Sequence, residues 1–165
     1  MKEIFVGALF LLLAIPACAV ESVAVELGGG THSVEIWRVG AQWKQQPKWL
    51  GESRWRLLWD LSIGSWNSST GTVHDFGLTP EFRHPIALRG AYFDAGIGFH
   101  VLSDSHISRD LGFSTRFQFG DHVGVGYDFG PFDVAARLQH LSNGGMRNPN
   151  PGINFLLLRI RYPLR

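Results

Sequence analysis

A histidine and a serine stand two positions apart near the C-terminal end of the chain, in the stretch LQHLSNGG at residues 138–145. If this stretch forms a β-strand, His140 and Ser142 point to the same side. A hydroxyl group beside an imidazole can serve as nucleophile and general base, as in serine hydrolases. Asn143 and Gly145, which follow directly, carry N–H groups that could stabilise a developing oxyanion. The residue types therefore indicate ester or acyl-transfer chemistry, if the strand exists and its face is accessible.

The elements that must position this pair are β-strands. Five stretches alternate apolar and polar residues, and three less regular stretches complete a set of eight. The regular stretches are 54–65, 91–101, 113–127 (with Phe113 on its apolar side), 132–142 and 153–162, and the others are 22–29, 32–43 and 72–83.

Strands of about ten residues separated by turn-rich segments are typical of outer-membrane proteins. The polar faces carry opposite charges, such as Asp133 and Arg137, which could pair inside a small barrel filled by its own side chains. We therefore predict an all-β fold, an eight-stranded antiparallel transmembrane β-barrel of the outer membrane. A soluble β-barrel or sandwich is the alternative.

The N-terminal segment has the features of a secretory signal peptide. Lys2 precedes an apolar run, residues 4–15, and Ala17-Cys18-Ala19 fits a cleavage site. We expect residues 1–19 to be the signal peptide and residues 20–165 to form a single barrel domain. A lipidated N-terminus at Cys18 is the alternative interpretation.

Composition excludes several classes of partner. The chain has 15 basic and 14 acidic residues, which gives no electrostatic case for nucleic acid. Its seven histidines show no H-E-x-x-H or comparable metal-ligand spacing, so we expect neither a metal nor another cofactor.

The direction in which the pair faces follows from the alternation. His140 and Ser142 share parity with Val134, Ala136 and Leu138, the apolar set of their strand, and therefore point outward, toward lipid. With both termini periplasmic, the turn at 128–131 is periplasmic and the segment 143–152 is extracellular. Polar groups facing lipid are costly without partners and are candidates for function. Alternatively, both residues lie among lipid headgroups, where their placement costs nothing.

Two further polar residues are expected on the same outward face. A hairpin folded about residues 147–148 places position 154 or 155 opposite His140, and Asn154 has the outward parity of its strand. Folding about residue 130 brings position 120 or 121 beside 139 or 140, and Asp121 also has outward parity. A bulge at Gly120 would turn Asp121 inward. Otherwise the sequence predicts a cluster of Ser142, His140, Asn154 and Asp121.

At this point the sequence resembles a known family, the outer-membrane lipid A 3-O-deacylases of the PagL type. The resemblance is densest over residues 112–154, in FGDHVGVGYDFG, HLSNGG and NPNPGIN. It implies a serine esterase without a metal cofactor that removes the 3-position acyl chain of lipid A in the outer leaflet. It would make Ser142 the nucleophile, His140 the base and Asn143 an oxyanion-stabilising residue.

One position departs from the family pattern. The third triad member of the family is a glutamate twelve residues after the serine, where this chain has Asn154. Three outcomes are open. Asn154 orients His140 through its carbonyl oxygen, Asp121 takes over the charged role from the other neighbouring strand, or the protein is a weakened or inactive relative.

The sequence therefore predicts a carboxylic ester hydrolase whose substrate is lipid A, or lipopolysaccharide. The expected partners are outer-membrane lipids, with a homodimer as the alternative to a monomer, and no nucleic acid. Two other functions stay open. One is a non-enzymatic, structural or adhesive barrel, and the other is an outer-membrane phospholipid esterase or acyltransferase that uses the same surface.

Overall fold

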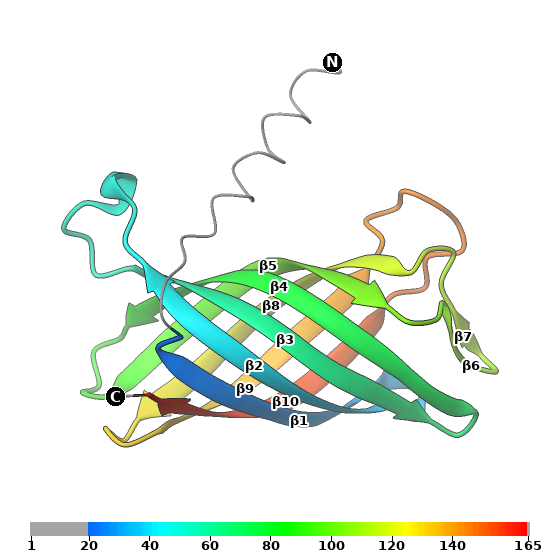
Figure 1. Cartoon of the computed structure of the whole chain (residues 1–165), viewed down its shortest axis with the longest axis horizontal. Coiled ribbons are helices and arrows are strands. Elements are labelled where there is room, and N and C mark those ends of the chain that lie inside the picture. Colours follow the sequence, from blue (N-terminus) through cyan, green and yellow to red (C-terminus); the bar gives the residue numbers. More distant parts are fainter. Residues whose placement is uncertain (1–19, 165) are drawn as a thin grey trace, which may run out of the picture.

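The computed structural model describes residues 20–164, so the proposed signal peptide, residues 1–19, lies outside the described residues. Eight long antiparallel strands close into a barrel in the order β1-β10-β9-β8-β5-β4-β3-β2 (Figure 1). Their bounds are β1 Ser22–Gly30, β2 Glu35–Gln45, β3 Arg56–Ser68, β4 Gly71–Pro85, β5 Ala91–Leu102, β8 Phe117–Asp128, β9 Asp133–Ser142 and β10 Ile153–Pro163. The predicted eight-stranded antiparallel barrel is confirmed.

The connections divide between the two ends of the barrel. The start of β1, the end of β10 and the connections 46–55, 86–90 and 129–132 lie at one end, which is the periplasmic end in barrels of this kind. The connections 86–90 and 129–132 are short. The connection 46–55 is longer and contains the 3-10 helix η2 (Lys48–Leu50). The extracellular end carries the 3-10 helix η1 (Thr31–Ser33), the β3–β4 turn, the segment 103–116 and the loop 143–152. The segment 103–116 contains an unpredicted small hairpin, β6 (His106–Ser108) with β7 (Leu111–Gly112).

The outer wall of the barrel is apolar because every second residue of each strand faces outward. This exposed belt requires a lipid environment, since soluble monomers rarely expose so large an apolar surface. No helix among residues 20–164 is long and apolar enough to cross a membrane. Members of the belt include Val25, Leu27, Leu61, Ile63, Phe76, Ile97, Val123, Val125, Leu138, Leu156, Leu158 and Ile160.

The lumen is filled by a network of buried ion pairs. Glu26 accepts hydrogen bonds from Arg38 at 2.8 Å, Arg137 at 3.0 Å and Arg159 at 2.8 Å. Arg137 also reaches Glu81 at 2.6 Å. The cavity left among these side chains measures about 10 Å³, room for about one water molecule. The barrel is therefore a packed core and not a channel.

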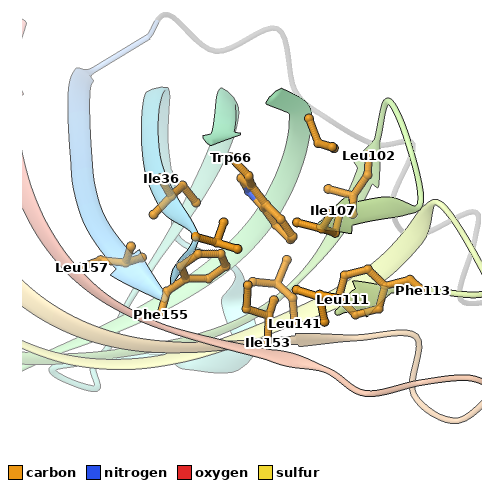
Figure 2. Packing of buried hydrophobic residues seen from close by; sticks show 12 residues of the cluster. Ile36, Trp66, Leu102, Ile107, Leu111, Phe113, Leu141, Ile153, Phe155 and Leu157 are labelled. Atoms are coloured by element: carbon orange, nitrogen blue, oxygen red, sulfur yellow. The ribbon is translucent and has the colours of Figure 1, made fainter. Parts of the chain in front are cut away.

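Beneath the extracellular mouth the lumen changes from polar to apolar. Trp66 and Phe155 pack edge to face, with ring centroids 5.1 Å apart, inside a cluster that Figure 2 shows. Phe113 belongs to this cluster with 4% of its surface exposed, so its predicted place on the lipid face was wrong. Strand β8 begins only at Phe117, and the alternation does not extend back to Phe113.

Candidate active site

Strand β9 places His140 and Ser142 on the outer wall at its extracellular end, where both side chains are half-buried. Their outward direction agrees with the parity of the sequence. Asn154 of β10 is the Cα partner of His140 on one side, and Asp121 of β8 is its partner on the other. The β8–β9 register runs unbroken from Phe119 to Asp128, without a bulge at Gly120. The four predicted polar residues therefore lie on one outward face.

The imidazole of His140 is held by Asn154. The distance between His140 Nδ1 and Asn154 Oδ1 is 2.7 Å. An amide oxygen is an acceptor only, so Nδ1 carries the proton and Nε2 is left free to accept one. Gly152 provides room for the ring, because a Cβ at this position would lie 2.6 Å from His140 Cε1. The local geometry thus selects the tautomer that a general base requires.

Asn154 is itself fixed by a residue that the sequence did not reveal. Pairing between β1 and β10 ends at Gly30 and Phe155. The next amide of β10, Asn154 N–H, donates to Thr31 Oγ1 at 3.3 Å. Thr31 opens the η1 turn, where His32 has a left-handed backbone with φ of 61°. The β1–β2 turn therefore completes the support of the orienting amide.

Asp121 lies on the opposite side of His140 and is exposed. Within residues 20–164 no hydrogen bond joins its carboxylate to the His140 ring. The ring contacts the β10 side of the site, at Asn154 and Gly152. Asp121 nevertheless remains the acidic group on the strand next to the imidazole.

The loop after Ser142 is organised by Asn143, whose side chain is fully buried. Its Nδ2 donates to Ser114 Oγ at 2.9 Å and to the Arg147 carbonyl oxygen at 2.7 Å. Its Oδ1 accepts the N–H of Gly145 at 2.9 Å. Its own backbone N–H donates to Asn150 Oδ1 at 2.9 Å. Both predicted oxyanion donors, Asn143 and Gly145, are thus engaged within the loop in this conformation.

A different backbone amide approaches the serine hydroxyl. Gly144 N–H points to Ser142 Oγ at a distance of 3.4 Å. Gly144 and Gly145 both have positive φ, 65° and 78°, which residues with a Cβ rarely adopt. The glycine pair therefore turns the chain back over Ser142. The sequence showed the glycines, but not which of the two amides lies beside the hydroxyl.

Among residues 20–164, no three His, Cys, Asp or Glu side chains gather in a way that could hold a metal ion. The site as described consists of a hydroxyl, an imidazole, an amide that orients it and a glycine turn. Groups of these types can carry out acyl transfer through a covalent acyl-serine.

Comparison with known proteins identifies the family. Residues 35–163 match the family model described as Lipid A 3-O-deacylase (PagL). Lipid A deacylase PagL of Bordetella bronchiseptica is 35% identical over 150 residues, which cover 85% of this chain and 82% of that protein. The Pseudomonas aeruginosa protein of the same name is 28% identical, with 86% of each chain covered.

Two solved structures extend the comparison. The crystal structure of the outer membrane enzyme PagL superposes with a TM-score of 0.75 at 27% identity, over 87% of this chain and 99% of that one. Neisserial surface protein A superposes with a TM-score of 0.51 at 14% identity, over 87% of this chain and 94% of that one, which shows a shared fold alone. Together with the match over most of the barrel, these relatives settle the family, and the chain belongs to the lipid A 3-O-deacylases of the PagL family.

Proposed function

We propose that this protein removes the 3-position acyl chain of lipid A by ester hydrolysis, from the outer leaflet of the outer membrane in which the barrel lies. Family membership supports the substrate and the reaction. The observation that carries the proposal is the 2.7 Å hydrogen bond between His140 and Asn154 on the lipid-facing wall, beside Ser142. A lipid substrate reaches an outward-facing site by lateral diffusion, without entering the packed lumen.

In the proposed reaction, Ser142 Oγ attacks the ester carbonyl carbon while His140 Nε2 takes the hydroxyl proton. The bond between the carbonyl carbon and the sugar oxygen then breaks, and His140 gives its proton to that oxygen. Water, activated by His140 in the same way, hydrolyses the acyl-serine. The products are lipid A with a free 3-hydroxyl group and one free hydroxy fatty acid.

We propose that Asn154 orients His140, as its hydrogen bond to Nδ1 supports. A neutral amide stabilises the imidazolium formed in the transition state less well than a carboxylate does. Asp121, on the neighbouring strand β8, is the alternative source of that negative charge. The two contributions differ in kind, because Asn154 sets the direction of the ring and Asp121 would act through its charge.

The oxyanion that forms on the ester carbonyl needs donors close to Ser142. Gly144 N–H, 3.4 Å from Ser142 Oγ, is a candidate in this conformation. Asn143 and Gly145 are engaged with each other and with the rest of the loop. We therefore assign them the task of shaping the glycine turn that presents the donor.

A hollow on the outer wall supports the proposal that the substrate carries an acyl chain. It measures about 330 Å³ and lies on the periplasmic side of His140, where residues of β5, β8, β9 and β10 line it. Its lining includes Ala136, Gly124, Phe93, Leu138 and Leu156. At 3.3 Å per residue, Leu138 and Ala136 lie about 7 and 13 Å along β9 from His140. A hydrocarbon chain attached at the site would fit into this hollow.

Mass spectrometry of lipid A from a host that expresses the protein tests the proposal. Wild type should remove one hydroxyacyl chain, and Ser142→Ala should leave lipid A intact. Ser103→Ala, a change at a serine of the segment 103–116, is the matched control and should retain activity. A heat-dependent shift in electrophoretic mobility confirms that each barrel is folded.

Other results would overturn the proposal. Loss of a phospholipid chain, with lipid A unchanged, would identify a phospholipid esterase or acyltransferase. Unchanged lipids in cells that contain a properly inserted wild-type barrel would indicate a protein without this activity, structural or adhesive in role.

A further inference from the structure

A second pocket lies at the periplasmic end of the barrel, opposite the catalytic site, where β10 ends (Figure 1 shows this strand end). It measures about 350 Å³, within the range of ligand-binding pockets, which begins at about 300 Å³. The β4–β5 connection, residues 86–90, forms one side, and the ends of β3 and β10 form the other. Five arginines line it: Arg54, Arg56, Arg83, Arg89 and Arg161.

The positive charge of this pocket is only partly neutralised. Arg83 pairs with Glu81 at 3.1 Å and with Asp133 at 3.2 Å, and Arg161 also contacts Asp133. Asp133 accepts a further hydrogen bond from Tyr92 at 2.6 Å. Arg54, Arg56 and Arg89 form no ion pair with any carboxylate among residues 20–164. Asp128 is the one acidic residue of the lining, and its Oδ1 accepts the N–H of Gly130 at 2.8 Å. An excess of guanidinium groups therefore surrounds the pocket.

The strand register concentrates this charge. Arg56 and Arg83 are Cα partners across β3 and β4, so their side chains share one face. Like charges in directly opposite positions destabilise a sheet unless something compensates them. Arg83 is buried, with 8% of its side chain exposed, and Glu81 and Asp133 compensate its charge. Arg56 is exposed and has no carboxylate partner among the described residues, so a bound anion would compensate its charge.

The rest of the lining indicates what kind of anion fits. Ile86, Ala87 and Leu88 provide an apolar side, and 66% of the Leu88 surface is exposed. Guanidinium groups bind phosphate oxygens in a two-point geometry. A phosphate beside a hydrocarbon wall matches the headgroup and glycerol region of a phospholipid. We propose that this pocket binds the phosphate of an anionic glycerophospholipid of the periplasmic leaflet.

Native mass spectrometry of the full barrel, released from a neutral detergent, tests the proposal. Phosphatidylglycerol, phosphatidylcholine and inorganic phosphate are supplied in separate titrations. Wild type should retain one phosphatidylglycerol molecule more tightly than phosphatidylcholine. The variant Arg56→Gln/Arg89→Gln should weaken retention by roughly tenfold or more, the usual effect of losing a charge-assisted hydrogen bond. The matched control, Arg109→Gln/Arg116→Gln, removes the same charge at the extracellular end and should bind as wild type does.

The alternative outcomes are distinct. Inorganic phosphate that competes with phosphatidylglycerol in wild type, but not in the double variant, supports a phosphate site and makes free phosphate a second source of ligand. Equal retention by wild type and the Arg56→Gln/Arg89→Gln variant, or equal loss in the extracellular control, overturns the proposal. The deacylase assay gives an independent result, because neither arginine belongs to the catalytic site.

Discussion

Replacing Asn154 with aspartate should make this enzyme faster. The aspartate side chain has the shape of asparagine, so the 2.7 Å contact with His140 Nδ1 should be kept. Two effects then favour catalysis. A carboxylate cannot present an N–H to the ring, so only the productive tautomer remains. Its charge also stabilises the imidazolium that forms as Ser142 loses its proton.

The size of the gain follows from the contact. A hydrogen bond with a charged partner contributes about 1 kcal/mol more than a neutral one, which corresponds to a rate increase of about five- to tenfold. Unit charges 4 Å apart near a protein surface attract by ~4 kcal/mol, which sets an upper limit near a thousandfold. Asn154 is exposed, and water screens part of this attraction. We therefore expect kcat to rise by about 10- to 100-fold.

The assay measures release of hydroxy fatty acid from lipid A in mixed micelles, at saturating substrate and at neutral to mildly alkaline pH, where the carboxylate is ionised. Asn154→Leu, which removes the acceptor at similar size, is the control and should be slower than wild type. A folded Asn154→Asp barrel that is no faster than wild type would refute the reasoning. If Asp121→Asn alone then abolished activity, the charge would come from β8.

Three further perturbations test other parts of the structure. Thr31→Val removes the acceptor for Asn154 N–H and should lower kcat by about three- to tenfold, while Thr31→Ser should restore it. Ala136→Phe fills the hollow below His140 and should lower kcat/KM by about tenfold for long acyl chains, with less effect on short ones. The control Ala41→Phe, on the far wall, should leave kcat/KM unchanged. Glu26→Gln leaves buried guanidinium groups without their shared carboxylate and should lower the free energy of unfolding by about 3–5 kcal/mol. Urea titration of the barrel in lipid vesicles measures this loss, and the exposed control Glu21→Gln should leave the free energy of unfolding unchanged.

Much of the barrel could be predicted because lipid and lumen impose a period of two on each strand. The predicted strand 132–142, for example, differs from β9 (Asp133–Ser142) by a single residue. The same periodicity fails where a segment leaves the wall. Residues 103–112 show no strand pattern, so the β6–β7 hairpin could not be predicted. The alternation of 113–127 continues past the start of β8 into this segment, which is why the burial of Phe113 was missed.

The site was predicted as far as strand register reaches. Counting along two hairpins brought Asn154 and Asp121 to the two sides of His140, and both pairings are confirmed. No comparable counting rule predicts contacts between segments that are far apart in the chain. Thr31 is 123 residues from Asn154 in the chain, and Ser114 is 29 residues from Asn143. Their hydrogen bonds depend on loop conformations that the sequence pattern does not encode.

The ion pairs around Glu26 have a consequence for how the protein assembles. This one carboxylate of β1 binds arginines of β2, β9 and β10, and thus joins the two ends of the chain. In an open, partly inserted sheet, the carboxylate and its guanidinium partners would face hydrocarbon unpaired, at a cost of several kcal/mol each. Such half-closed intermediates are therefore unfavourable within the bilayer. Insertion and closure of the barrel should occur together, as one cooperative step that waits for the last strand to arrive.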